Sequence, residues 1–221
     1  MGGKRTKVIG EMEGRQARWY ARQRMTPSQR VAVRGRAHQL QSSLQAGARV
    51  LEVASGPGLL AIELARSERL TVVGLDVSQT MVEIAIENAA REGVAVKFEH
   101  GDVAQLPFAD GSFDLVVCQA AFKNFSEPRR ALDEIYRVLA PGGRAEIDDL
   151  SKEASTGEIE EEVRKMGLSK LNAFVTKWIL ATVLRRRAYS RAQIEQLASS
   201  SAFGSCLFAR DGIGFTVTLS R

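Results

Sequence analysis

The chain has 221 residues, of which 44% are hydrophobic and 26% are charged, with a formal net charge of +5. This composition is typical of one soluble globular domain and supplies enough apolar side chains for a buried core. The only cysteines, Cys118 and Cys206, stand in apolar runs, which excludes a disulfide framework or cysteine-ligated metal site and predicts buried, reduced thiols. No apolar run approaches the roughly 20 residues of a membrane span, and the polar N-terminus is unlike a signal peptide, so we expect a cytoplasmic protein.

The first 47 residues are polar, rich in arginine and predicted to be helical, with a break at Pro27. Arginines cluster at 15–36 and again at 185–191. Outside these clusters the chain is not strongly basic. A solvated basic face is therefore favoured over a nucleic-acid partner.

From residue 49 onwards, apolar strands alternate with short helices. Helices of about 10–15 residues between strands predict parallel βαβ units, and near-continuous apolar strands predict a sheet covered on both faces. Ser78 stands where an N-cap belongs, before a helix whose apolar positions begin at Met81. The expected strands are 49–54, 71–76, 95–100, 113–119 and 144–149, and the expected helices include 57–67 and 129–140.

The alternation stops after residue 150. Residues 151–189 are expected to be helical without a strand, and residues 190–203 to form a further helix. Residues 206–220 then have the pattern of a β-hairpin that turns at Asp211-Gly212. We therefore predict a parallel sheet that is closed by an antiparallel pair.

A nucleotide-like ligand is predicted at “VLEVASGPGLLAIELA”, residues 50–65, which has the pattern of a buried strand, a glycine turn and a helix. Gly56 and Gly58 allow the backbone to approach a ligand closely. Asp76 ends the next strand, about 20 residues later, where a carboxylate can accept both ribose hydroxyls. Asp102 follows the third strand, where a carboxylate could accept from an adenine amine.

Glu52 helps to decide between two ligands of this shape. The pyrophosphate of NAD carries negative charge, and a carboxylate four residues before Gly56 would repel it. S-adenosylmethionine carries a sulfonium cation and an amino group, which such a carboxylate suits. S-adenosylmethionine is therefore favoured, and an NAD-dependent oxidoreductase is the alternative.

A linked set of motifs then points to a family. “LEVASGPG”, “GLDVS”, “GDVAQLPFADGSFDLVVC” and “RVLAPGG” occur in this order over residues 49–148. The set resembles the class I S-adenosylmethionine-dependent methyltransferases, in particular the small-molecule branch that includes the ubiquinone and menaquinone methyltransferases. The resemblance implies an α/β, Rossmann-like fold with a seven-stranded, mostly parallel sheet, an antiparallel last strand and helices on both faces.

The resemblance also implies which residues contact the cofactor. Ala54 departs from the family loop, which often begins with glycine, so the backbone there is less free. The implied contacts are Tyr20, folding over the cofactor; Glu52, Ala54, Gly56, Gly58 and Gln119, at its methionine end; Asp76, at the ribose; Val77 and Met81, beside the adenine; and Asp102 with Val103, at the adenine amine.

The chain offers no obvious catalytic base. Quinone-type relatives often carry histidine soon after the fourth strand, where this chain has “AAFKNFSEP”. Lys123, Asn124, Tyr20 and His38 are candidates. A protonated lysine is a poor base unless it is desolvated, and a surface loop lysine is an equal interpretation. His38 is expected to be packed or at the surface. No base is assigned.

We expect a single domain of four segments: an N-terminal helical segment at 1–47, a cofactor-binding core at 48–150, a helical insertion at 151–189, and a C-terminal helix with a β-hairpin at 190–221. The insertion carries a one-sided apolar set that includes Phe174 and Trp178. It is interpreted as a helix packed on the sheet, with a lid over an apolar acceptor, or a surface touching lipid, as alternatives.

The predicted function is methyl transfer from S-adenosylmethionine to a small-molecule acceptor, which leaves S-adenosylhomocysteine. One alternative is an RNA methyltransferase using the arginine clusters, although the N/D-P-P-aromatic run of many such enzymes is missing after the fourth strand. A cofactor-binding regulator without catalysis is the other alternative. The sequence does not decide the acceptor or the oligomeric state.

Overall fold

The computed structural model describes residues 12–166 and 170–221. Residues 1–11 and 167–169, parts of the expected N-terminal and insertion segments, lie outside the described residues. One seven-stranded sheet has the order β3-β2-β1-β4-β5-β7-β6. Its strands are β1 (Arg49–Val53), β2 (Thr71–Asp76), β3 (Lys97–His100), β4 (Phe113–Gln119), β5 (Leu139–Leu150), β6 (Leu207–Asp211) and β7 (Gly214–Ser220).

The pairing directions confirm the expected sheet. Strands β1 to β5 pair in parallel, and β7 runs antiparallel to both β5 and β6. β3 is shorter than expected. β5 starts five residues earlier than expected, because Leu139 pairs with Phe113 before a bulge at the “PGG” segment. The strand order reverses between β1 and β4, which places the ligand-binding switch point of an open α/β sheet there.

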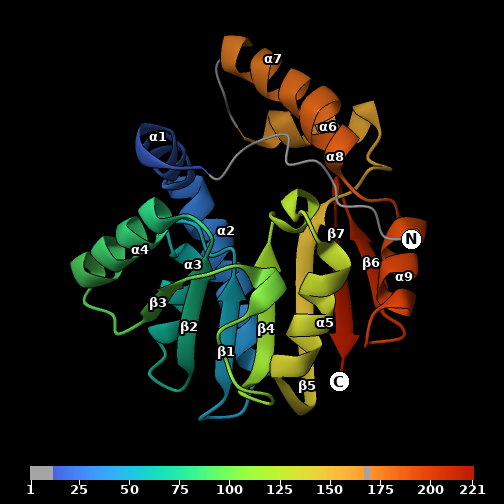
Figure 1. Cartoon of the computed structure of the whole chain (residues 1–221). Helices are drawn as coiled ribbons and strands as arrows, with labels where there is room; N and C mark the ends of the chain where they lie inside the picture. The colour runs from blue at the N-terminus through green and yellow to red at the C-terminus, as the bar shows by residue number, and fades with distance from the viewer. Residues whose placement is uncertain (1–11, 167–169) are drawn as a thin grey trace.

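Helices cover both faces of the sheet (Figure 1). The helices are α1 (Gly14–Arg24), α2 (Pro27–Ser42), α3 (Leu59–Ala65), α4 (Gln79–Glu92), α5 (Pro128–Val138) and α9 (Arg191–Ser200), with short 3-10 turns η1 (Val103–Gln105) and η2 (Phe122–Asn124). Alternate residues of β1 and β4 point to opposite faces of the sheet. Val50 and Leu115 pack with α2, α3 and α4, whereas Leu51 and Val116 pack with α5 and α9.

Local signals start these helices where expected. Thr26 caps α2 ahead of Pro27, so the predicted break separates α1 from α2. The Ser78 hydroxyl accepts from the Met81 N–H, which confirms the predicted N-cap of α4. Of the two free cysteines, Cys118 is buried as expected, whereas Cys206 is only partly buried because it precedes the edge strand β6.

The insertion lies on the carboxyl side of the sheet (Figure 1). It consists of α6 (Thr156–Lys165), α7 (Lys170–Trp178), the π-helical turn η3 (Ile179–Leu184) and α8 (Arg185–Arg187). Ala173, Leu180 and Ala181 pack against a small buried cluster that Ala154 forms with Ile159 and Val163 of α6. The predicted apolar set faces outward instead: Phe174 is 69% exposed and Trp178 is 56% exposed. The structure therefore differs from the expected helix packed on the sheet, because the smaller side chains form its inner face.

Candidate functional site

A cavity of about 450 Å³ lies at the carboxyl edge of β1, β2 and β4. Its size is within the range typical of small-molecule sites. The loops after these strands form its floor, α1 borders it on one side and α8 on the other. The lining residues are Met12, Tyr20, Arg24, Val33, Glu52, Ala54, Ser55, Gly56, Pro57, Leu59, Leu60, Asp76, Val77, Met81, Gln119, Ala120, Ala121, Lys123, Asn124, Phe125, Ser126, Arg186 and Arg187.

Most of the predicted cofactor contacts meet in this cavity. Tyr20, Glu52, Ala54, Gly56, Asp76, Val77, Met81 and Gln119 all line it. Gly58, Asp102 and Val103 are absent from the lining. The exposed Asp102 side chain instead accepts from the Ala104 N–H at 2.9 Å and so caps η1.

Glu52 is a buried carboxyl at the end of β1, only 4% exposed, and its Oε2 accepts from the Ala61 N–H at 2.8 Å. Burial raises its pKa to about 8, and the nearby Asp76 adds to the increase against the opposing effect of the Ala61 bond. Without a ligand, Glu52 is therefore mostly protonated at pH 7. This state differs from the carboxylate expected from the sequence, because the sequence does not show how completely the group is desolvated.

Asp76 ties the glycine loop to the start of α4. Its Oδ2 accepts from the Gly56 N–H at 2.7 Å, and its Oδ1 accepts from the Ser78 N–H at 2.9 Å. Burial raises the pKa of this carboxyl, while these two backbone bonds oppose the increase. Each oxygen can accept one more hydrogen bond. Because Asp76 lines the cavity, its carboxylate can accept from both hydroxyl groups of a bound diol.

Two residues at the strand ends are held in the left-handed region. Ala54, after β1, has φ 54°, and Ala120, after β4, has φ 55°. Such a conformation costs a residue other than glycine roughly 1–2 kcal/mol, and strained backbone of this kind is concentrated at functional sites. Gly58 has a different role: an added Cβ would lie 2.6 Å from the Phe98 ring, so a glycine is required for packing.

The loop that follows β4 at the base of the cavity contains one partner of a buried ion pair, Lys123. The Lys123 ammonium lies 2.7 Å from Asp149 Oδ1 and also donates to the Ala120 carbonyl. The Lys123 N–H donates to Asp149 Oδ2 at 2.8 Å. The two side chains are only 6% and 1% exposed. Lys123 is therefore not a surface loop lysine, because its Nζ is buried and already bonded to Asp149 and to the Ala120 carbonyl.

Other polar residues near the strand ends either have structural partners, line the cavity or lie outside it. His38 is exposed on α2, outside the cavity lining. His100 bonds the Val77 carbonyl through Nε2 at 2.9 Å, which supports the loop after β2. Gln119 Nε2 donates to Asp148 Oδ2 at 3.4 Å. Asn124 lines the cavity beside Lys123.

Several residues of the cavity were not predicted from the sequence. Glu13 accepts from the Gln79 N–H at 2.8 Å and from Thr80, and thereby fixes α1 on α4 so that Tyr20 faces the cavity. Arg24, Arg186 and Arg187 line the cavity from α1 and α8. The arginine clusters were visible in the sequence, but nothing there indicated that they converge.

The chain is similar in sequence to known methyltransferases. Residues 50–143 match the family described as “Methyltransferase domain”. The chain is 41% identical over 108 residues to a demethylmenaquinone methyltransferase of Deinococcus radiodurans, which covers 48% of this chain and 45% of that protein. It is 45% identical over 97 residues to the enzyme of the same name from Thermus thermophilus, over 43% and 44% of the two chains. The chain thus spans less than half of the length of these curated relatives.

Solved structures confirm the predicted fold. A SAM-dependent methyltransferase from Aquifex aeolicus superimposes with a TM-score of 0.69 at 20% identity, covering 91% of this chain and 97% of that one. A protein described as a S-adenosyl-L-methionine-dependent methyltransferase of Methanococcus maripaludis gives 0.73 at 22% identity, covering 98% and 97%. The sequence and fold findings together confirm the resemblance to class I methyltransferases and to the quinone-methyltransferase branch.

Proposed function

We propose that this chain, whose residues 50–143 match the methyltransferase-domain family, transfers a methyl group from S-adenosylmethionine to a small-molecule acceptor. The observation that carries the proposal is the single cavity wall in which Glu52, Gly56 and Asp76 converge at the strand-order switch. The names of the curated relatives support a quinone-like acceptor. The other product is S-adenosylhomocysteine.

The residues present fit this cofactor. Asp76 offers two carboxylate oxygens where the ribose would lie, and Val77 and Met81 supply an apolar wall for the adenine. Glu52, with Ala54, Gly56 and Gln119, would take the methionine end, and Tyr20 would cover it. We retain Gly58, Asp102 and Val103 as proposed contacts of the adenine side and the loop, although these residues do not line the cavity.

The protein's own contribution is alignment and exclusion of water. When bound, the cofactor supplies a methyl group on a positive sulfur: the carbon–sulfur bond breaks as the bond to the acceptor forms, and a neutral thioether leaves. Lys123 and Asp149 fix the loop after β4 beside the transfer site. A proton on the acceptor would have to leave through a group other than the paired Lys123.

Calorimetric titration of the whole protein tests the cofactor. We expect S-adenosylhomocysteine to bind at micromolar affinity and NAD not to bind. Asp76→Ala should weaken S-adenosylhomocysteine binding by about 100-fold or more, since two charge-assisted bonds are lost. Asp102→Ala is the matched control and should weaken it less, because one bond is lost. Binding of NAD alone, or equal affinity of wild type and a folded Asp76→Ala protein, would contradict the proposal.

Turnover is measured separately, as release of S-adenosylhomocysteine from S-adenosylmethionine with demethylmenaquinone analogues and RNA as acceptors. We expect release with the quinone analogues or with another small acceptor, and none with RNA. Cofactor binding without any turnover across a broad set of acceptors would favour the non-catalytic regulator instead.

A further inference from the structure

The outer side of the insertion carries a row of apolar side chains. The row consists of Phe174, Val175, Trp178, Ile179 and Val183, all of them exposed. They recur four residues apart along α7 and η3, and side chains at this spacing lie on the same side of a helix. Other side chains of the same segment face inward, against α6. The five exposed residues, which we call the insertion stripe, therefore form one apolar surface.

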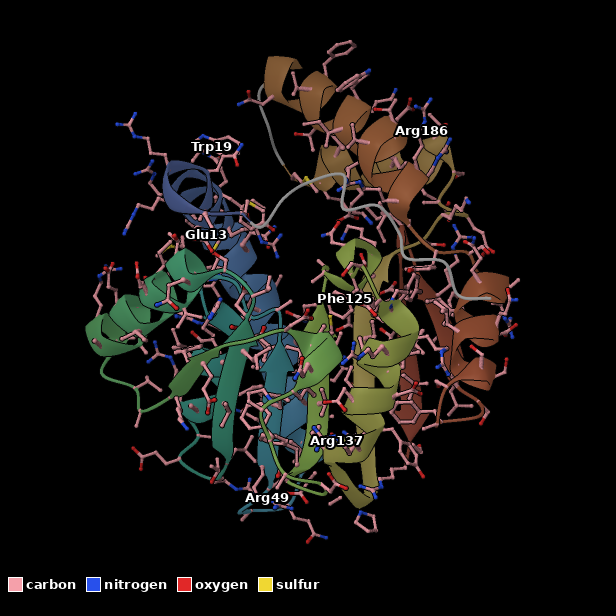
Figure 2. All side chains as sticks on the ribbon, viewed as in Figure 1. Glu13, Trp19, Arg49, Phe125, Arg137 and Arg186 are labelled. Carbon is pink, nitrogen blue, oxygen red and sulfur yellow. The ribbon has the colours of Figure 1, made fainter. Side chains whose placement is uncertain are left out.

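The helix on the other border of the cavity also exposes a large aromatic side chain. Trp19 of α1 is 59% exposed, whereas its neighbour Tyr20 lines the cavity. Figure 1 shows α1 and α7 at the same end of the molecule, beyond the carboxyl ends of the strands. In Figure 2, Trp19 on α1 and Arg186 on the insertion both lie at this end. Exposed aromatic side chains therefore stand on both sides of the cavity, which α1 and α8 border.

Both helical segments are strongly basic: α1 contains four arginines, and α7, η3 and α8 together contain two lysines and three arginines, with no acidic residue in either segment. Arg15 and Arg22 lie on the same side of α1 as Trp19, at spacings of four and three residues. These two arginines and Arg186 are exposed, and none of the three has a carboxylate partner among the described residues. The four glutamates of α6 already pair with basic residues, one of them Lys177. The end of the molecule around the cavity is therefore both apolar and positively charged.

A lipid surface with negative charge matches both properties. Aromatic and aliphatic side chains of an amphipathic helix enter the boundary between head groups and acyl chains, while its arginines contact the phosphates. A second copy of the chain matches less well, because a twofold contact would bring the same positive surface against itself. RNA also matches less well: aromatic rings can stack on bases, but the aliphatic Val175, Ile179 and Val183 would remain in water. The combination therefore favours lipid.

We propose that the insertion stripe and Trp19 dock the protein on an anionic lipid surface, with the carboxyl edge of the sheet facing the lipid. In this orientation the exposed arginines of α1 and α8 contact the head groups, and the cavity lies between the two docking segments. An apolar, quinone-like acceptor partitions into lipid and would reach the cavity without crossing water. This route for the acceptor rests on the proposed methyltransferase function, whereas the docking does not.

Vesicle sedimentation of the whole protein tests the docking. One set of vesicles is phosphatidylcholine alone, and the other contains about 30% phosphatidylglycerol, which makes its surface negative. We expect binding to the anionic vesicles to be at least about tenfold tighter at low salt, and this preference to decline as salt is added. An equal affinity for the two sets would overturn the inference.

Tryptophan fluorescence reports the same event at the surface itself, because the only two tryptophans of the chain are Trp19 and Trp178. Anionic vesicles should shift the emission to shorter wavelength, and lipids with bromine on the acyl chains should quench it. Trp19→Phe and Trp178→Phe should each retain the signal of the remaining ring. Emission that is neither shifted nor quenched while the protein sediments with vesicles would show that these rings stay in water, and would overturn the proposed surface.

The apolar part of the surface is tested by the double variant Phe174→Ser, Trp178→Ser, which should weaken vesicle binding by about tenfold or more because less apolar area is buried. Leu207→Ser is the matched control. Leu207 is also exposed, but it starts the edge strand β6 and lies level with the middle of β5 rather than with its carboxyl end. Binding that survives in the double variant, or that Leu207→Ser weakens as much, would overturn the inference.

The basic part is tested by the double variant Arg15→Gln, Arg22→Gln, which should reduce the preference for anionic vesicles. Arg69→Gln, Lys97→Gln is the matched control, because it removes two exposed charges at the amino ends of β2 and β3 and should leave the preference unchanged. An equal loss in both double variants would show that only net charge matters and would overturn the proposed surface.

The competing partners and the proposed function are tested separately. Single-stranded RNA that binds as tightly as the anionic vesicles would assign the basic surface to nucleic acid and overturn the inference. A dimer in sedimentation velocity that Phe174→Ser, Trp178→Ser dissociates, without vesicle binding by the wild type, would assign the stripe to a second copy and also overturn it. Vesicle binding is measured without cofactor, so failure of S-adenosylhomocysteine to bind would overturn the proposed function alone.

Discussion

Replacement of Glu52 by Gln tests the electrostatics of the cavity most directly. Glutamine keeps an oxygen that accepts from the Ala61 N–H but does not ionise. The pKa of Glu52 is about 8 in the folded protein and has an ordinary value of 4.5. The folded pKa is the higher one, so the stabilising effect of the neutral carboxyl is fully present below pH 4.5 and is lost as the pH rises to about 8.

The size of this effect on the unliganded protein follows from linkage. Within this window the Glu52 contribution should lower the free energy of unfolding by about 1.4 kcal/mol per pH unit, to a total of about 5 kcal/mol. At pH 7 the loss is about 3 kcal/mol. Glu52→Gln should therefore be more stable than the wild type at pH 7 by about this amount, and the two proteins should converge near pH 4.5.

The affinity for S-adenosylhomocysteine should also depend on pH, because binding changes the protonation of Glu52. A cationic amino group beside Glu52 favours the carboxylate, so S-adenosylhomocysteine binding at pH 7 should release about 0.9 proton. Wild-type affinity should rise about 50-fold from pH 6 to pH 8. Glu52→Gln should bind more weakly, release no proton from this site and lose this pH dependence.

Urea unfolding at several pH values measures the first effect, and calorimetry in buffers of different ionisation enthalpy measures the second. Glu87→Gln, an exposed change on α4, is the matched control and should follow the wild type in both assays. Identical pH profiles of stability for wild type and Glu52→Gln between pH 5 and 8 would refute the raised pKa. Proton release that persists in Glu52→Gln would refute the ligand assignment.

Three further changes test other parts of the structure. Ala54→Gly should raise the free energy of unfolding by about 0.5–1 kcal/mol, since glycine relieves the left-handed conformation, whereas Ala61→Gly in α3 should lower it; a loss of stability in Ala54→Gly would contradict the strain. Lys123→Met should destabilise the protein by about 3–5 kcal/mol because Asp149 is left buried without its partner, and a loss below about 1 kcal/mol in urea unfolding would show that the pair is solvated. Trp178→Ala should change stability by less than about 0.5 kcal/mol because the ring is exposed; if the insertion is a lid, it should reduce turnover, and amide exchange over 172–183 should slow when S-adenosylhomocysteine binds, while exchange as slow as that of β4 in both states would exclude a lid.

Local sequence was sufficient for the elements and for much of the site. Apolar runs and glycine turns located the strands, Ser78 marked a helix start and Pro27 marked a break between two helices, because capping and turn chemistry act within a few residues. Gly56 and Asp76, which are 20 residues apart in the chain, both line the cavity, since parallel strands end at one edge of the sheet.

The surroundings of each side chain could not be predicted from local sequence. Lys123 and Asp149 are 26 residues apart in the chain and meet only because β4 and β5 are neighbours. Periodicity showed that the insertion has an apolar face at Trp178 but could not show that this face is left exposed. The pattern of strands and turns was enough to predict the fold and to predict that Glu52 and Asp76 lie near the glycine turn. The raised pKa of Glu52 and the presence of Arg24 and Arg186 in one cavity follow only from folding, because burial and proximity depend on residues that are distant in the sequence.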